Sequence, residues 1–249
     1  MEQTLLLYQT PTHPCGYFDD RPAVSRFVDP RVHMDPRLYG QLMELGFRRS
    51  GEQVYRPACP GCSACRSARI PVAAFQPNRS QRRTLRANAG VTATARPAGF
   101  IPEHYELYLR YVRGRHAGGG MDEDDPAKFL GFLTASWSDT RFLELREDGR
   151  LLAVAVTDVT PAGLSAVYTF FDPDLAGRSL GTLAILSQLR WARELGLPYL
   201  YLGYWIAGHP KMDYKRRFRP LEIYDSGDWG RLGPDRQATD GPAASATSP

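Results

Sequence analysis

Three cysteines lie within seven residues of this chain, and their spacing is typical of a metal site. Cys59, Cys62 and Cys65 form two Cys-x-x-Cys steps that share one residue, and turn-forming residues between them let the thiolates converge. Cys15 brings the number to four, which suits a tetrahedral zinc ion or an iron–sulfur cluster, and His13 is a further candidate ligand. The spacing does not choose between these metals. Thiolate redox chemistry and ordinary buried thiols are the alternatives.

A second candidate site lies at the start of a long helical pattern. Arg178-x-x-Gly181 stands where acyltransferases of the GNAT type carry an Arg/Gln-x-x-Gly-x-Gly/Ala loop. The backbone N–H groups of that loop and the helix N-terminus hold the pyrophosphate of coenzyme A. Leu183 occupies the third anchor and would crowd a phosphate that needs close backbone approach. We therefore expect no coenzyme A here, and a plain strand–helix turn is the alternative.

Basic residues are concentrated in two runs. Residues 1–90 hold thirteen arginines and no lysine against seven acids, and the stretch 66–86 holds no acid. A second run, within residues 209–218, mixes cations with Tyr214 and Phe218. Arginine forks match phosphate geometry and aromatic rings can stack on bases, so both runs predict contact with a nucleic acid. A solvated, slightly basic surface is the alternative.

Periodicity indicates the elements that must position these residues. Apolar residues recur at helical spacing in five stretches, and four stretches have strand composition between turn signals such as Asp148-Gly149. The predicted helices cover residues 36–45, 80–88, 102–115, 125–135 and 179–195, and the predicted strands cover 141–146, 151–159, 165–171 and 199–206, with a strand and a Pro- and Gly-containing link at 90–100.

This order of elements predicts an α+β protein. Helices, three antiparallel strands, a long helix and a further strand fit a GNAT-like acyltransferase domain with a mixed sheet at residues 100–232. Residues 1–95 are predicted to form a separate domain rich in Cys and Arg. The tail at residues 233–249 consists mainly of Gly, Pro, Ala, Ser and Thr, and we expect it to be disordered because it can bury little apolar area.

Length and composition exclude some classes of protein. The 249 residues suffice for a sizeable core, and the apolar and charged fractions are ordinary for a globular protein. No apolar run approaches the roughly 18–20 residues of a membrane helix, and the N-terminus lacks the pattern of a signal peptide. The sequence therefore predicts a cytoplasmic protein, in which structural disulfides are rare.

The chain resembles the arginyl/leucyl-tRNA–protein transferases of the N-degron pathway, and most closely their bacterial aspartate/glutamate leucyltransferase branch. The likeness covers residues from about 5 to 232, and its motifs are modest singly but highly specific in one order. Those motifs are His13-Pro14-Cys15-x-Tyr17, Gly46-Phe47-Arg48-Arg49-Ser50-Gly51, Tyr55-x-Pro57-x-Cys59-x-x-Cys62-x-x-Cys65, Ser80-Gln81-x-Arg83, Tyr108-x-x-Tyr111-x-x-x-Arg115-His116, residues 151–158, residues 168–174, Ser179-Leu180-Gly181-Thr182, residues 199–204 and Pro210-x-Met212-x-Tyr214-Lys215-x-Arg217-Phe218. His209 stands where the family often has a cysteine, which puts any chemical role of that cysteine in doubt here.

The resemblance implies an aminoacyl-tRNA donor in place of an acyl-CoA. The enzyme would move leucine from Leu-tRNA to the N-terminal amine of proteins that begin with Asp or Glu, and a protease adaptor could act downstream. Arginine transfer to the same acceptors is the alternative within the family. A GNAT N-acyltransferase that uses acyl-CoA and a zinc-ribbon-like RNA-binding module without enzymatic activity are the rivals outside it. Leu183 at the third position of the phosphate-binding loop argues against the acyl-CoA enzyme. The aromatic-rich C-terminal half with its buried helix argues against a simple RNA-binding module.

Site residues follow from the resemblance and from the chemistry. Backbone N–H groups at the start of the long helix would hold the tRNA 3′ end, and tyrosines near the strand ends would shape the aminoacyl pocket. Basic residues would pair with the acceptor carboxylate or with tRNA phosphates, and a few side chains could carry protons. The candidates are Arg178 and Gly181 for the 3′ end, Tyr168 and Tyr204 for the pocket, Arg49, Lys215 and Arg217 for the carboxylate, Arg82 and Arg83 for tRNA, and His116, Asp172 and Tyr214 as proton carriers.

Overall fold

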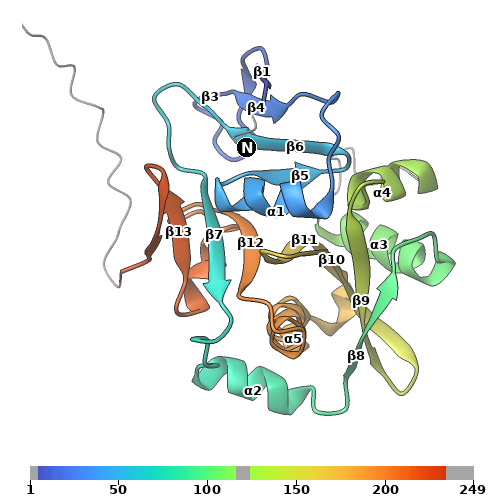
Figure 1. Ribbon diagram of the computed structural model, residues 1–249. Helices are drawn as coiled ribbons and strands as arrows, with labels where there is room; N and C mark the ends of the chain where they lie inside the picture. The colour runs from blue at the N-terminus through green and yellow to red at the C-terminus, as the bar shows by residue number, and fades with distance from the viewer. Residues whose placement is uncertain (1–4, 116–123, 234–249) are drawn as a thin grey trace, which may run out of the picture.

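An eight-stranded mixed sheet forms the centre of the computed structural model, which describes residues 5–115 and 124–233 (Figure 1). The strand order is β14-β13-β7-β12-β11-β10-β9-β8, and neighbours are antiparallel except for the parallel pair β11 and β12. The strands are β7 (Arg66–Pro71), β8 (Thr92–Pro97), β9 (Asp139–Glu147), β10 (Arg150–Thr160), β11 (Gly163–Phe171), β12 (Tyr199–Trp205), β13 (Glu222–Asp225) and β14 (Asp228–Arg231).

Turn residues set the register of the antiparallel strands β9, β10 and β11. Asp148 and Gly149 join β9 to β10 with φ of 49° and 82°, as a two-residue hairpin turn requires. Gly163 begins β11 at φ 143°, and a Cβ atom there would overlap the carbonyl oxygen of Tyr199. The hairpin predicted from Asp148-Gly149 is therefore confirmed.

Helices cover the sheet, and several begin at side-chain caps. Asp35 and Asp125 accept hydrogen bonds from the first-turn N–H groups of α1 and α4, and Asn78 and Gln81 form a reciprocal capping box on α2. None of the helices in the described ranges is long and apolar enough to cross a membrane. The helices are α1 (Pro36–Glu44), α2 (Arg79–Ala87), α3 (Pro102–Arg115), α4 (Pro126–Leu133) and α5 (Leu180–Glu194), with 3₁₀ helices η1 (Pro173–Arg178) and η2 (Asp213–Arg217).

The strand β10 is buried on both faces, and its residues alternate between two cores. Ala153 and Ala155 face α5, where their small side chains allow the helix to pack closely. Val154 and Val156 face the opposite core, which is shared with α3 and α4. A central strand covered by helices on both sides is expected to be largely apolar, as residues 151–156 of this one are.

A smaller sheet from the N-terminal part lies beside the large sheet, above α1 in Figure 1. One buried cluster joins α1, the small sheet and Tyr201 of β12. Its strands, in the order β1-β4-β6-β5, are β1 (Leu7–Gln9), β4 (Ser25–Val28), β6 (Gln53–Pro57) and β5 (Arg48–Ser50), and a separate hairpin joins β2 (His13–Pro14) to β3 (Pro22–Ala23).

The mixed sheet and its helices agree with the predicted fold class, whereas residues 1–95 do not stand apart from it. The strand β7 comes from that segment and lies between β12 and β13 in the large sheet. The boundary expected near residue 95 falls at β8, the edge strand of the same sheet. The tail predicted to be disordered lies outside the described residues from position 234 onward.

Candidate functional site

The parallel strands β11 and β12 pair near their amino ends and diverge toward their carboxyl ends. They pair at Leu164–Leu200 and Ser165–Tyr201, and the structure shows no later pairing between them in the described ranges. In open α/β sheets, ligands bind at the carboxyl ends of such strands. Tyr168 of β11 and Tyr204 of β12, both predicted to shape a donor pocket, lie beyond the last paired residues.

Tyr168 presents a free hydroxyl among aromatic rings. Its ring lies 5.2 Å from Phe132, 6.3 Å from Tyr111 and 6.4 Å from Tyr108, measured between centroids. The hydroxyl is buried and forms no hydrogen bond within the part of the chain that the structure describes. Burial, and then the neighbouring Tyr111 and Tyr108, raise the pKa of Tyr168. At neutral pH this residue is therefore a neutral donor with an unused O–H group.

Arg48 of β5 lies against β12, whereas Tyr168 belongs to β11, the strand that diverges from β12. Its guanidinium carbon lies 5.5 Å from the ring centroid of Tyr204, and its buried Nε has no hydrogen-bond partner among the described residues. Gly203, at φ 69°, makes this approach possible because a Cβ there would lie 2.8 Å from Nη1 of Arg48. Sequence reasoning did not single out Arg48.

Lys215 of η2 places a second cation close by. Its side chain is buried, and its Nζ donates a hydrogen bond to the backbone oxygen of Tyr204. Burial, and then the charge of Arg48, lower the pKa of Lys215 to about 7. The adjacent Tyr214 exposes 42% of its surface, and desolvation raises its pKa to about 12. Lys215 and Tyr214 thus lie near Arg48, as part of one group of polar side chains.

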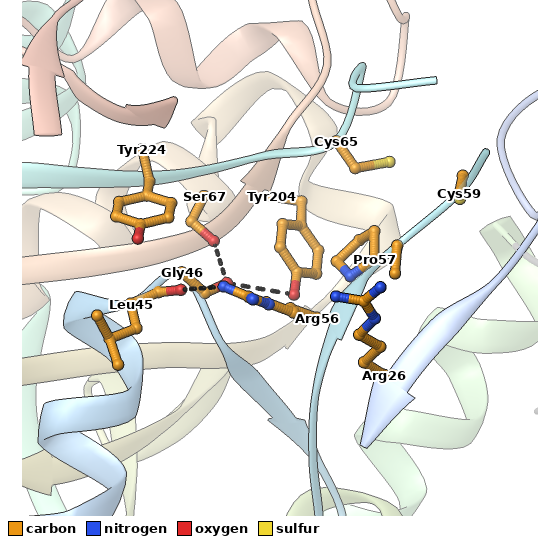
Figure 2. A pocket seen from close by; sticks show the side chains of 11 residues that line it. Arg26, Leu45, Gly46, Arg56, Pro57, Cys59, Cys65, Ser67, Tyr204 and Tyr224 are labelled. Carbon is orange, nitrogen blue, oxygen red and sulfur yellow. Dashed lines mark hydrogen bonds between the residues drawn. The ribbon is translucent and has the colours of Figure 1, made fainter. Parts of the chain in front are cut away.

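A cavity of about 380 Å³ is lined by residues of the small sheet, of β7 and by Tyr204. Figure 2 shows the side chains around it. The Tyr204 hydroxyl donates to the backbone oxygen of Tyr55 at 3.1 Å, and Ser67 donates to the backbone oxygen of Gly46 at 2.7 Å. These hydroxyls are engaged with backbone and hold the strands together. The lining residues are Arg26, Leu45, Gly46, Arg56, Pro57, Ala58, Cys59, Cys65, Ser67, Tyr204 and Tyr224.

All four cysteines line a second cavity, of about 220 Å³. They are free thiols, and burial, followed by the other three thiols, raises the pKa of Cys65 to about 12. Cys59 exchanges hydrogen bonds with the backbone of Val24, and Arg21 donates to Cys62 at 3.8 Å. Within residues 5–115 and 124–233, no group of three or more His, Cys, Asp or Glu side chains is arranged to hold a metal ion. The thiols are neighbours that do not form a coordination shell.

The start of α5 is open to an anion. Ser179 precedes the helix in the left-handed region, at φ 54°, and its side chain makes no capping hydrogen bond. Gly181 lies in the first turn, where an added Cβ would meet Phe171 at 3.4 Å. Arg178 is already engaged, because it pairs with Glu147 at 2.6 Å and donates to Asn88 at 2.9 Å. The N–H groups of this turn are thus freer to bind a phosphate than the Arg178 side chain.

Two of the predicted proton carriers are described by the structure, and they lie apart. Asp172 is buried at the cap of η1, where it pairs with Arg110 at 2.8 Å and Arg150 at 2.5 Å. Burial opposes its charge, but hydrogen bonds from the Asp174 N–H and from Arg150 lower its pKa. This carboxylate stays charged at neutral pH, which fits a structural role. Tyr214 lies beside Lys215, and His116 lies outside the described residues.

The two basic runs meet on the surface. Asn78 and Gln81, at the start of α2, donate to the backbone oxygen of Arg217 in η2, at 3.2 and 3.1 Å. The exposed arginines of this surface are Arg79, Arg82, Arg83, Arg86 and Arg217. The basic stretch is shorter than expected, because Arg66 and Arg69 belong to β7 and pair there with Asp225 and Glu222.

Arg49 is engaged in a buried internal ion pair. Its side chain is fully buried and forms a double hydrogen bond with Asp158, at 2.6 and 2.7 Å. It also donates to the backbone oxygen of Leu133 at 2.8 Å and to Thr140 at 3.2 Å. Alternation along β5 turns the neighbouring Arg48 to the opposite face. That alternation is the signal in the sequence that could have separated the two arginines.

Comparison with known proteins gives matches along almost the whole chain. Residues 13–83 match the sequence model of the family described as "Arginine-tRNA-protein transferase, N terminus", and residues 103–225 match "Arginine-tRNA-protein transferase, C terminus". An aspartate/glutamate leucyltransferase of Stenotrophomonas maltophilia (strain K279a) is 54% identical over 234 residues, which cover 92% of this chain and 93% of the relative. One of Alcanivorax borkumensis is 51% identical over 226 residues, covering 91% and 93%.

A solved structure shares the fold at low sequence identity. The crystal structure of FemX superposes with a TM-score of 0.52 at 9% identity, covering 90% of this chain and 87% of FemX. The match spans the small N-terminal sheet as well as the large one, since both are needed to reach that coverage. It shows a common architecture for the whole chain.

Proposed function

The chain belongs to the arginine-tRNA–protein transferase family and is an aminoacyltransferase, and on this premise we propose that it moves leucine from Leu-tRNA to the N-terminal amine of proteins that begin with Asp or Glu. The observation that carries this proposal is the identity of 54% to a leucyltransferase over nine-tenths of both chains. Cytoplasmic proteins marked for degradation would be the acceptors, with a protease adaptor acting downstream.

The surroundings of Tyr168 favour leucine over arginine as the transferred residue. The rings of Phe132, Tyr108 and Tyr111 would bury an apolar side chain favourably. An arginine side chain would need a carboxylate in such a place, and the groups that act on Tyr168 in the described part of the chain are aromatic. The donor leucine would therefore lie along β11.

The chemistry asks little more than alignment, because the donor ester is already activated. The acceptor amine, with an ordinary pKa of about 7.7–8.0, attacks the ester carbonyl carbon in its neutral form. The bond to the tRNA ribose oxygen breaks, the ribose hydroxyl leaves with a proton, and an amide remains. The unused hydroxyl of Tyr168 is suited to donate to the developing oxyanion, and the open N–H groups near Gly181 are suited to the tRNA 3′ phosphate.

The basic surface formed by α2 and η2 would bind the tRNA body. Arg82, Arg83 and Arg217 are exposed there and lie close to one another, as the hydrogen bonds from α2 to the Arg217 carbonyl show. Contacts of this kind hold phosphates and read no sequence. Selection among charged tRNAs would then come from the amino acid and the acceptor end.

The four cysteines are proposed as ligands of a zinc ion or an iron–sulfur cluster. Their donor set fits either group, and all four line one cavity, so the side chains would have to rearrange to close the shell. When bound, the group would fasten the β2–β3 hairpin to the loop before β7. Metal analysis of the purified protein should find about one zinc, or about two or four iron atoms, per chain. Equal metal content in the Cys62→Ser variant would contradict these ligands.

A transfer assay tests the proposed function directly. The purified protein is incubated with Leu-tRNA or Arg-tRNA and with peptides that begin with Asp, Glu, Ala or Lys, and mass spectrometry identifies the added residue. Leucine on the Asp and Glu peptides alone supports the proposal. Arginine in its place would keep the family and change the donor. Addition from neither tRNA, together with binding in a coenzyme A titration, would favour an acyl-CoA enzyme.

A further inference from the structure

Arg48 is a partly buried cation that lacks a counter-ion. Its Nε is buried without a hydrogen-bond partner, and none of the carboxylates in residues 5–115 and 124–233 forms an ion pair with it. Burial opposes its charge, and the groups that raise its pKa are phenols, first Tyr55 and then Tyr204. Those phenols are uncharged at neutral pH, so they give the guanidinium dipoles and a ring face but no negative charge.

A second cation lies beside Arg48. Arg48 lies close enough to Lys215 to lower the pKa of the lysine, so the two groups repel each other. A buried charge normally has a partner, because leaving it unpaired is strongly unfavourable. The next residue, Arg49, shows the usual solution in its double hydrogen bond to Asp158. The surroundings of Arg48 are therefore those of a cation whose counter-ion is supplied by a bound ligand.

An anion could reach Arg48 from solvent. The residue is only partly buried, and two exposed tyrosines, Tyr17 and Tyr214, interact with it electrostatically. Arg48 lies against Gly203 of β12, while Tyr168 lies on β11, so the two residues stand on either side of the divergence. An acceptor amine attacking a donor held along β11 would bring its own side chain toward β12.

We propose that Arg48 binds the side-chain carboxylate of the acceptor's N-terminal residue and so restricts the acceptors to Asp and Glu. This inference rests on the proposed function. A guanidinium can hold a carboxylate through two parallel hydrogen bonds, whereas an amide of Asn or Gln would present N–H groups to it. The uncharged phenols around Arg48 would line the remaining walls of the site. Charged acceptors are therefore preferred over amides of the same shape.

Steady-state transfer kinetics test the assignment. Peptides that begin with Asp, Glu, Asn or Gln are compared at saturating Leu-tRNA, for the wild type, Arg48→Gln, Arg48→Lys and the surface control Arg141→Gln. We expect Arg48→Gln to raise KM for the Asp peptide by about 10- to 100-fold, the range for loss of a charged hydrogen bond, with a much smaller change in kcat. Arg48→Lys should recover part of the preference for Asp over Asn, and Arg141→Gln should behave as the wild type.

The outcomes separate this inference from the proposed function. A wild type that adds leucine to none of the peptides contradicts the function itself. Transfer by the wild type, with an unchanged KM and an unchanged Asp-over-Asn preference in Arg48→Gln, overturns the role of Arg48 alone. A crystal structure of the wild type with the dipeptide Asp-Ala covers the case in which variants fail to fold. A carboxylate within hydrogen-bond distance of the Arg48 guanidinium supports the assignment, and a carboxylate bound elsewhere overturns it.

Discussion

Lys215 holds an amine of lowered pKa inside the protein, and this makes stability depend on pH. Its pKa is lowered from the ordinary 10.5 to about 7, first by burial and then by Arg48. Between these two values the unfolded chain holds a proton that the folded chain lacks. The free energy of unfolding therefore rises with pH across this window, by up to about 1.4 kcal/mol per pH unit. Below the window Lys215 is protonated in both states and contributes no pH dependence.

Replacement of the amine should remove that dependence. Relative to Lys215→Met, the wild type should gain stability from pH 7 to pH 9 in urea unfolding, whereas removal of the hydrogen bond to the Tyr204 carbonyl adds only a constant offset. Lys211→Met removes an exposed lysine nearby and controls for the change in net charge. Parallel stability curves for the wild type and Lys215→Met would show that the amine keeps its charge when buried.

Side-chain roles were harder to predict from the sequence than side-chain types. Alternation along β5 predicts that Arg48 and Arg49 point to opposite faces, but it does not say which face meets an acid. Asp158, the partner of Arg49, lies 109 positions further along the chain. Only the packing of β5 on β10 decides which arginine is neutralised. For the same reason the sequence alone could not show that Arg49 is held in a buried ion pair while Arg48 has no carboxylate partner among the described residues.

The elements of the C-terminal half were predictable because their signals are local. Helical spacing in 179–195 and the turn at Asp148-Gly149 gave α5 and the β9–β10 hairpin to within a few residues. The strand β7 was missed because its arginines suggested a basic surface. In the structure Arg69 pairs with Glu222 and lies 3.7 Å from the ring centroid of Tyr199, so distant residues neutralise and cover it.

The helix α2 should bind tRNA through its exposed arginines. The double variant Arg82→Glu/Arg83→Glu should weaken tRNA binding and flatten the plot of log affinity against log salt concentration, by about one unit of slope for each phosphate that is no longer bound. Fluorescence titration at several salt concentrations measures both quantities. The double variant Arg96→Glu/Arg141→Glu changes the net charge equally at the sheet edge formed by β8 and β9. If the two double variants have the same slope, net charge and not the α2 surface governs binding.

At the scale of the whole molecule, the N-terminal segment is joined to the large sheet at one buried ionic junction. Arg49 of β5 contacts Asp158 of β10, Thr140 of β9 and the backbone oxygen of Leu133 in α4. The Arg49 and Asp158 side chains are both inaccessible to solvent. Four elements from distant parts of the sequence therefore meet at a single guanidinium. This junction, together with β7, explains why the N-terminal segment packs as part of the same body as the large sheet.

Removing the charge of Asp158 alone should lower the free energy of unfolding. Asp158→Asn keeps the shape and the contact with Thr140 but leaves Arg49 charged and buried without an anion, so we expect a loss of about 3–5 kcal/mol in the free energy of unfolding. Glu194→Gln breaks the exposed pair with Arg190 on α5 and should cost less than about 1 kcal/mol. Chemical denaturation of both variants provides the measurement. A loss for Asp158→Asn no larger than that for Glu194→Gln would mean that water or a shift of β5 solvates Arg49, and that the small sheet is held mainly by its apolar contacts with α1 and Tyr201.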